Sequence, residues 1–377
     1  MAALNIMPIV RKEFRQIKRD KRILGVLLFI PAMMLFMFGY ALNFDVKHTR
    51  LAVYDEEQSR LSREFIQLFF NSEYFDYVRT LQSKSEINEL LDGEHVRAVL
   101  VVPSTFSKDL QKGRSTSIQV IVDGANSNAA ATVLGYINAI IQQYSLKVMS
   151  QSFMRLGKQQ ITLPIDFEPR IWYNPELKSA KFLVPGLIAF ILMVTAVVST
   201  ALSVVREREL GTMEQIMVSP IKPIEVILGK TIPYTAISLV ATVMILVLGY
   251  ILFDISIKGS VLLLSMVTFF FLVGGLGMGL LISTLVETQQ LAFMIAVFVS
   301  MLPTFILSGF VFPIRNMPLI IQGITYLLPA RYFLVALRAI ILKGAGLSAF
   351  WDQAIVLCLY TVVMIGISSL RMRKILM

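Results

Sequence analysis

Long apolar runs dominate this sequence and limit what it can fold into. Six of them hold about 20 residues or more, the length that a helix needs to cross the hydrocarbon core of a bilayer. They are residues 23–42, 182–205, 231–253, 261–285, 290–311 and 351–370. Only 16% of the residues are charged, against roughly 25% in an ordinary soluble domain. We therefore predict a membrane α-helical bundle of six transmembrane helices.

Basic residues predict the orientation of this bundle. Residues 1–22 carry seven lysines and arginines against two acidic residues, and the last span ends at Arg371, Arg373 and Lys374. Lysine and arginine concentrate in the cytoplasmic segments of membrane proteins, so both termini are predicted to be cytoplasmic. The net charge of +10 lies largely beside apolar runs. We interpret it as orientation and lipid contact rather than as nucleic-acid binding.

The first 22 residues also have a helical pattern. Ile6, Val10, Phe14 and Ile17 share one helical face, and basic side chains cover the rest. This pattern predicts an amphipathic helix that lies along the cytoplasmic interface of the membrane. Its central residues are Glu13, Phe14, Arg15, Arg19 and Asp20.

The sequence changes character between the first two spans, over residues 43–179. Short strands are predicted at 51–55, 96–103, 117–123 and 165–173, and helices at 59–71, 85–92, 105–112 and 128–156. Strands that alternate with helices indicate a small α/β domain. Because one span precedes it, this inserted domain is predicted to be extracytoplasmic.

A polar segment, residues 206–230, separates the second and third spans. Gly211 is expected to end the preceding helix, and Thr212 with Gln215 has the spacing of a capping box that starts a new one. Ser219-Pro220 is expected to end that helix, because the residue before proline is pushed out of the helical region. The result is a cytoplasmic helix of about two turns over 211–220, a shape suited to docking.

Residues 312–333 are apolar but interrupted by prolines, among them Pro313 and Pro329. No uninterrupted piece is long enough to cross a bilayer. We expect a re-entrant or interfacial pair of half-helices on the outer side, with Arg331 in the second of them.

Gly275 and Gly279 form a GxxxG pair in the fourth span. Small residues at this spacing let helix backbones approach closely. The pair fits a subunit or gating interface, and it also fits ordinary packing within one bundle.

Side chains for catalysis are not apparent. The polar residues of the spans are mainly hydroxyls, without the acidic or histidine relay that is typical of ion-coupled carriers. Gly229-Lys230-Thr231 resembles the end of a phosphate-binding loop, but Ile224 stands where the first glycine is required. We predict no catalytic residue, no metal site and no cofactor in this chain. If energy drives this protein, it is then expected to come from a partner.

Five blocks of sequence carry a family resemblance. They are KEFRQIKRDKR (12–22), ELGTMEQIMVSPIKPIEVILGK (209–230), LGMGLLIST (276–284), LSGFVFPIRNMP (307–318) and YLLPARYF (326–333). Together they resemble the permease subunit of ABC-2 type transporters, in the bacterial multidrug-export branch with a large extracytoplasmic domain between the first two spans. The resemblance extends over essentially the whole chain, and the GTMEQ–SP block is its most specific part.

This resemblance implies an exporter of amphiphilic drugs or similar hydrophobic compounds in the bacterial inner membrane. Two permease copies, or this chain and a paralogue, would rest on two cytoplasmic ATPase subunits that bind ATP and Mg. The coupling helix would consist of Gly211, Thr212, Glu214, Gln215, Ser219 and Pro220. The interfacial helix would lie beside it, the half-helices would close the outer end, and the α/β domain would extend the path towards the periplasm or an adaptor protein.

Two other functions fit the same sequence. A lipid or polysaccharide export permease of the same superfamily would have equally uncharged spans. A membrane-anchored sensor or binding module would use the extracytoplasmic domain to bind a ligand, although six spans exceed what an anchor needs.

Overall fold

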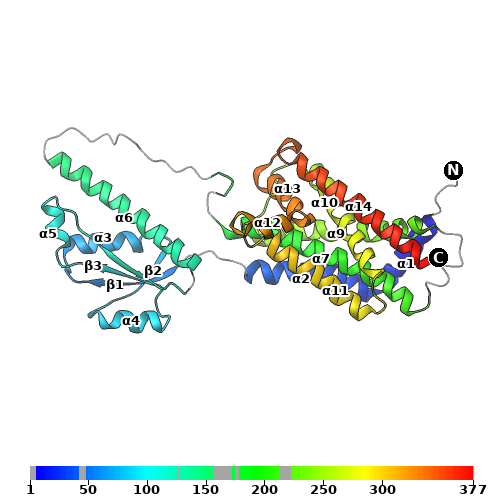
Figure 1. The fold of residues 1–377 in the computed structure, drawn as a ribbon. Coiled ribbons are helices and arrows are strands. Elements are labelled where there is room, and N and C mark those ends of the chain that lie inside the picture. The colour runs from blue at the N-terminus through cyan, green and yellow to red at the C-terminus, as the bar shows by residue number, and fades with distance from the viewer. Residues whose placement is uncertain are drawn as a thin grey trace. The chain divides into compact units, whose positions relative to one another are not determined.

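The computed structural model describes residues 6–41, 48–125, 127–155, 172–174, 178–212 and 222–376. The chain divides into two compact units, drawn in Figure 1. One, Met1–Asn43 with Arg170–Met377, is a helical bundle. The other, Phe44–Pro169, is an inserted α/β domain.

The bundle consists of long apolar helices. Among the described residues, five are long and apolar enough to span a bilayer, or six if the bent pair α12–α13 counts as one span. The five are α7 (Ser179–Glu209), α9 (Pro223–Phe253), α10 (Val261–Ser283), α11 (Gln289–Leu307) and α14 (Trp351–Leu376). A further apolar helix, α2 (Lys21–Ala41), lies where the first span was predicted.

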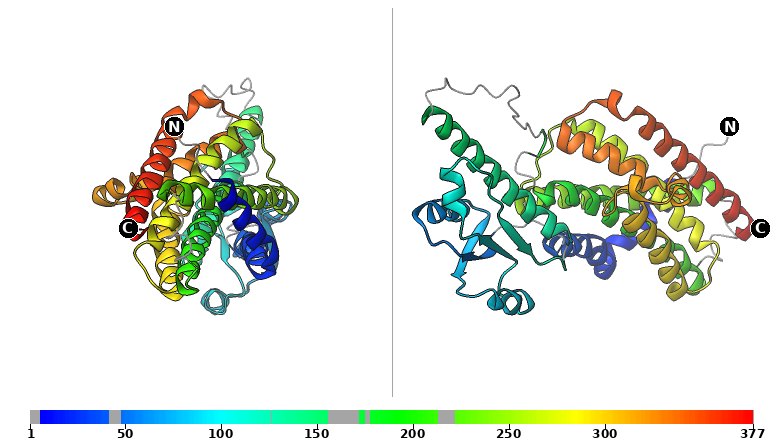
Figure 2. Two further views of the ribbon diagram at one scale, coloured as in Figure 1. Left: turned by 90° about the vertical axis from the view of Figure 1, so that its right-hand side faces the viewer. Right: turned by 60° about the vertical axis from the view of Figure 1, so that its left-hand side comes forward.

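Helix α7 forms the centre of the bundle. Most of its residues are buried, and it packs against α2, α9, α10, α11 and α13 (Pro329–Lys343). In the left view of Figure 2, α2 (blue) and α14 (red) lie on opposite sides of the bundle. The transmembrane core is therefore built around one helix of 31 residues.

Both helices that flank the polar segment 206–230 continue into it, and the first ends at Gly211 as predicted. Helix α7 continues through Glu209 and ends where Gly211 adopts a φ of +69°, a left-handed conformation that glycine adopts readily. Helix α9 begins at Pro223, and Glu225 accepts a hydrogen bond from the backbone N–H of Lys222 at 2.8 Å. Residues 213–221, with the predicted coupling-helix residues Glu214, Gln215, Ser219 and Pro220, lie outside the described residues.

Helix α1 (Met7–Arg19) forms within the predicted interfacial helix, but the face that packs on the bundle overlaps only partly with the predicted apolar stripe. The buried residues are Ile9, Glu13 and Ile17, whereas Phe14 is 41% exposed. Of the predicted apolar stripe, Ile17 is thus buried, Ile6 and Val10 are partly buried, and Phe14 is exposed. An acidic residue, Glu13, occupies the centre of the face that packs on the bundle. Asp20 ends α1, and α2 follows directly.

The proline-rich region forms short helices. A 3₁₀ turn, η1 (Ile314–Asn316), follows Pro313, and α12 (Leu319–Thr325) is bent by 80° from α13. A bent pair of this kind is a broken span or a re-entrant segment. Helix α13 begins at Pro329 and continues to Lys343, beyond the range predicted for the half-helices.

The inserted domain has a four-stranded sheet of order β2-β1-β3-β4. Strands β1 (Thr49–Asp55), β2 (Phe75–Thr80) and β3 (Ala98–Val102) are parallel, and β4 (Gln119–Val122) is antiparallel to β3. The helices are α3 (Arg60–Phe70), α4 (Ser85–Asp92), α5 (Phe106–Gln111) and α6 (Ser127–Arg155). The buried side chains of β1 and β3 alternate between two hydrophobic clusters, one with α3, α5 and α6 and one with α4.

Sequence patterns located three of these four strands. Strand β2 was missed because its residues after Phe75 are exposed, so it lacks the alternation that indicates a half-buried strand. Of the predicted strand 165–173, residues 165–171 lie outside the described part of the chain, and Trp172 and Tyr173 are not in a strand.

The loop after β1 is fixed by a carboxylate. Glu57 accepts a hydrogen bond from the backbone N–H of Ser107 at 2.9 Å and another from the Ser59 hydroxyl at 2.8 Å. Burial acts to raise the pKa of Glu57, but the hydrogen bonds from Ser107 and Ser59 outweigh it, so the pKa is lowered from its ordinary value.

Candidate functional site

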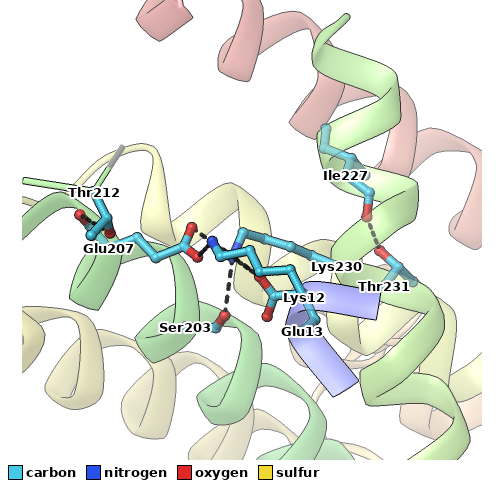
Figure 3. Close-up of polar contacts among 8 residues, drawn as sticks. All are labelled: Lys12, Glu13, Ser203, Glu207, Thr212, Ile227, Lys230 and Thr231. Atoms are coloured by element: carbon cyan, nitrogen blue, oxygen red, sulfur yellow. Dashed lines mark hydrogen bonds and ion pairs between the residues drawn. The ribbon is translucent and has the colours of Figure 1, made fainter. Parts of the chain in front are cut away.

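A buried cluster of charged side chains joins three helices at the α1 end of the bundle (Figure 3). It consists of Lys12 and Glu13 from α1, Glu207 from α7 and Lys230 from α9, and we call it the junction. Lys230 Nζ lies 2.8 Å from Glu13 Oε1 and 2.8 Å from Glu207 Oε2. Lys12 pairs with the other oxygen of Glu207. Segments far apart in sequence are thus held at one point.

Burial makes the junction sensitive to the loss of Glu13, Glu207 or Lys230. The side chains of Lys230 and Glu13 are each 1% exposed and that of Glu207 is 3% exposed, whereas Lys12 is 45% exposed. Two cations balance two carboxylates, so the cluster carries no net charge. Removing one partner of a buried pair leaves an uncompensated charge and costs about 3–5 kcal/mol.

Close packing surrounds the junction. Lys230 Nζ also donates to the hydroxyl of Ser203 on α7 at 3.3 Å. At the neighbouring Gly229, an added Cβ would lie 2.6 Å from Cγ2 of Ile9, so α1 rests directly on the backbone of α9. The charged and apolar contacts therefore fix α1 to the same turn of α9.

The last turn of α7 makes a separate contact with each of its charged residues. Arg206 Nη1 lies 3.0 Å from Asp20 Oδ2, at the break between α1 and α2. Arg208 donates to a backbone carbonyl in the turn between α10 and α11 at 2.9 Å. Glu209 accepts from the backbone N–H of Gln289 at 2.7 Å. With Glu207 in the junction, this turn is connected to α1, α9 and the α10–α11 turn.

The predicted coupling segment is flanked by these contacts. On one side, Thr212 donates its hydroxyl to the carbonyl of Glu207 at 3.1 Å and so closes the end of α7 (Figure 3). On the other side, Lys222 and Glu225 start α9, which carries Lys230. Both flanks of residues 213–221 therefore lead into helices that meet in the junction.

A cavity of about 560 Å³ lies beside the junction. Its apolar lining comes mainly from α2, α7 and α11, and its polar residues at the α1 end are Gln16, Asp20, Arg206 and Gln289. Ser203 lines the cavity and also accepts a hydrogen bond from Lys230, so the junction adjoins the cavity through this residue. The arrangement suits a ligand with an apolar body and a polar head.

Aromatic rings follow the cavity towards the α12 end of the bundle. Phe190 lies one helical turn beyond Val194, which lines the cavity. The ring centroids of Phe190 and Phe305 are 5.7 Å apart, and those of Phe305 and Phe310 are 5.5 Å apart. Phe310 packs on Gly186, where an added Cβ would lie only 2.1 Å from its ring. We call these three rings the aromatic plug.

Arg338 of α13 holds the backbone around this plug. Its guanidinium donates to the carbonyls of Phe182 and Gly309, each at 3.1 Å, and of Phe310 at 3.3 Å. It also stacks on the ring of Phe182, 3.9 Å from the centroid. Arg338 therefore connects the beginning of α7 to the turn that follows α11.

The two predicted packing glycines face α7 of the same chain. An added Cβ at Gly275 would lie 3.3 Å from the Ala196 side chain. One at Gly279 would lie 2.1 Å from the Thr200 hydroxyl and 2.3 Å from the Val197 carbonyl. The Thr200 hydroxyl itself donates across to α10, at 3.0 Å from a carbonyl oxygen. The glycines thus permit close packing of α10 on α7.

The predicted outer residues form a separate group. Pro313 precedes η1, Pro329 begins α13, and the guanidinium of Arg331 stacks on Tyr326 at 3.7 Å and donates to the Thr325 hydroxyl. None of these residues lines the cavity or joins the junction. They shape the bend between α12 and α13.

Sequence reasoning singled out Glu13 and Asp20 but missed their partners. Glu207 and Lys230 were assigned to the polar segment 206–230 without partners, and Arg338 lies in a stretch that received no prediction. One signal was available: Glu13 lies between Ile9 and Ile17 at intervals of four, so it shares a helical face with buried apolar residues. A carboxylate on such a face requires a buried cation nearby.

Comparisons with known proteins agree with this architecture. A family model described as ABC-2 family transporter protein matches residues 23–370. The chain belongs to this family. It is a membrane permease, and not itself an enzyme, because permeases of ABC transporters leave ATP hydrolysis to a partner subunit.

Three relatives of this ABC-2 permease come from Escherichia coli (strain K12). The probable multidrug ABC transporter permease YbhS is 32% identical over 364 residues, covering 96% of this chain and 95% of the relative. The probable multidrug ABC transporter permease YbhR is 32% identical over 345 residues, covering 92% of each chain. The inner membrane transport permease YhhJ is 28% identical over 375 residues, covering 98% of this chain and 97% of the relative.

Proposed function

We propose that this ABC-2 permease forms the transport path of an ATP-driven exporter for amphiphilic, largely hydrophobic compounds. The observation that carries the proposal is the apolar cavity bounded by α2, α7 and α11, with a polar mouth at one end and the aromatic plug beyond its other end. A largely uncharged lining accepts an apolar body at little desolvation cost, and the polar mouth keeps its head solvated. The names of the relatives YbhS and YbhR support a multidrug role.

In this proposal, residues 211–220 act as the coupling helix to a cytoplasmic ATPase. Gly211, Thr212, Glu214, Gln215, Ser219 and Pro220 provide this element. The junction supports the assignment because it joins the helices on both flanks of the segment to α1. Movement of the segment by the ATPase would shift α7 and α9 together, and α7 carries Phe190 of the plug.

We further propose a topology of six spans, formed by α2, α7, α9, α10, α11 and α14, with α12–α13 as a re-entrant pair on the outer side. Both termini then lie in the cytoplasm of a bacterial cell, and the inserted domain lies outside the inner membrane. The basic residues of α1 and those at the end of α14 support this orientation, because lysine and arginine favour the cytoplasmic side.

The partners in this proposal are two ATPase subunits, a second permease and the surrounding lipids. The ATPases bind ATP and Mg, and this chain binds neither. A paralogue is a reasonable second permease, since YbhS and YbhR are two permeases of one strain that are equally similar to this chain. The inserted domain extends the path towards the periplasm or an adaptor.

The experiment is purification of the chain from its native host in mild detergent, with mass spectrometry of the bound proteins. We expect a stoichiometric ATP-binding subunit, retained by the wild type and lost from Glu214→Lys. The matched control is Glu64→Lys, a charge reversal at an exposed position of α3. Recovery of the permease without an ATPase, or with a signalling protein in its place, would refute the exporter function.

A further inference from the structure

The polar end of the cavity, which we call the mouth, holds two charged side chains. Of the described residues that line the cavity, only Asp20 and Arg206 are charged. Arg206 Nη1 lies 3.0 Å from Asp20 Oδ2 in an ion pair. The side chain of Arg206 is 37% exposed and that of Asp20 is 23% exposed. Both groups thus remain within reach of a headgroup, and together they carry no net charge.

The cavity wall formed by α7 offers hydrogen-bond acceptors. Thr195, Ser199 and Ser203 recur at intervals of four, so they share one face of α7 along about 12 Å of helix. Thr195 and Ser199 donate their hydroxyl hydrogens to carbonyls of their own helix, at 2.8 and 3.0 Å. Their oxygens keep lone pairs that can accept from a ligand. The opposing walls, from α2 and α11, are apolar except for Gln289 at the mouth.

We infer that the cavity selects amphiphiles with a zwitterionic headgroup, and this inference rests on the transport function proposed above. A headgroup with one charge complements only one member of the Asp20–Arg206 pair. A zwitterionic headgroup presents a charge to each member at once, so it complements both. The apolar tail then extends between α2 and α11.

The expected size of this preference follows from the exposure of the pair. A partly exposed ion pair is worth little in absolute terms, so exchange of one such pair changes affinity by about fivefold at most. A sharper test is how the headgroup preference changes when Asp20 or Arg206 is replaced. Asp20→Asn removes the negative charge of the pair and should favour anionic headgroups, whereas Arg206→Gln removes the positive charge and should favour cationic ones.

The experiment measures occupancy of the cavity in lipid nanodiscs. The natural Cys358 is replaced by Ser, and Val297→Cys, on the α11 wall of the cavity, carries an environment-sensitive fluorophore. The probes share one tail and are used below their micellar concentrations: dodecylphosphocholine, dodecyltrimethylammonium and dodecyl sulfate. The same fluorophore at Leu262→Cys, an exposed position 80% accessible on α10, reports how much of each probe enters the bilayer.

We expect the wild type to bind dodecylphosphocholine about fivefold more tightly than either singly charged probe. Asp20→Asn should raise the relative affinity for dodecyl sulfate, Arg206→Gln should raise that for dodecyltrimethylammonium, and the double variant should lose the preference. The same order of affinities in all four proteins would overturn the headgroup inference while leaving the transport function intact. If no probe changes the signal at residue 297, both proposals fail.

Discussion

Replacement of Lys230 by Met should destabilise the bundle strongly, because Lys230 is the buried cation between two buried carboxylates. The variant keeps the length and apolar body of the side chain but removes the charge that lies 2.8 Å from both Glu13 and Glu207. Two carboxylates then share Lys12, which is 45% exposed and lies 3.9 Å from Glu13. We expect the free energy of unfolding to fall by about 3–5 kcal/mol.

A second substitution separates this mechanism from ordinary packing damage. Lys230→Met leaves one cation with two carboxylates, whereas Lys230→Met combined with Glu13→Gln leaves one cation, Lys12, with one carboxylate, Glu207. The double variant should therefore be more stable than Lys230→Met alone, although it carries an additional change. Two independent losses of packing would instead add.

The assay is reversible unfolding of the detergent-solubilised chain with increasing fractions of denaturing detergent, followed by circular dichroism. Lys258→Met, an exposed lysine in the loop between α9 and α10, is the matched control and should change stability by less than about 0.5 kcal/mol. The reasoning is wrong if Lys230→Met lies within about 1 kcal/mol of the wild type, or if the double variant is the least stable of the set.

Three further predictions concern other parts of the chain. Gly279→Ala should cost about 1–3 kcal/mol because its Cβ would overlap α7, whereas Gly366→Ala, with no atom within 4 Å, should be neutral in the same assay. Arg338→Gln should raise hydrogen exchange around the turn after α11, and Lys343→Gln should not. Because the folded state lowers the pKa of Glu57, its contribution to stability is present above the usual glutamate pKa, about 4.3, and is lost as the pH falls through the lowered value. The difference in proteolytic resistance of the inserted domain between wild type and Glu57→Gln should therefore disappear on acidification, and a constant difference would contradict this.

The sequence allowed the elements of this fold to be located, because apolar length and periodicity are local properties. Helices α10 and α14 begin at the first residue of the predicted spans, and α9 begins earlier than its predicted span and contains it. Helix α6 matches the predicted helix at 128–156 closely. The prolines at 313 and 329 likewise marked the start of η1 and α13. Each of these signals is contained in a short window of sequence.

The junction could not be predicted in the same way, because its members are far apart in the chain. Glu13 and Lys230 are separated by 217 positions, and no local pattern specifies that they meet. The run of charges Arg206–Glu209 was assigned to a polar segment, and no partner was predicted for any of them. In the structure it is the last turn of α7, and each of its charges has a partner on another element.

One helix connects the two ends of the proposed transport path. Phe190 of the plug and Glu207 of the junction both lie on α7, and a helix rises about 1.5 Å per residue, so about 25 Å of continuous backbone separates them. Pro185 lies beyond Phe190, so the stretch between plug and junction contains no proline at which the helix could bend independently. A tilt imposed at Glu207 therefore displaces Phe190 as well. In the proposed mechanism, coupling between the ends would then require no chain of side-chain rearrangements. It would require only that the junction transmit force to α7 without breaking, and buried, balanced charges suit that role.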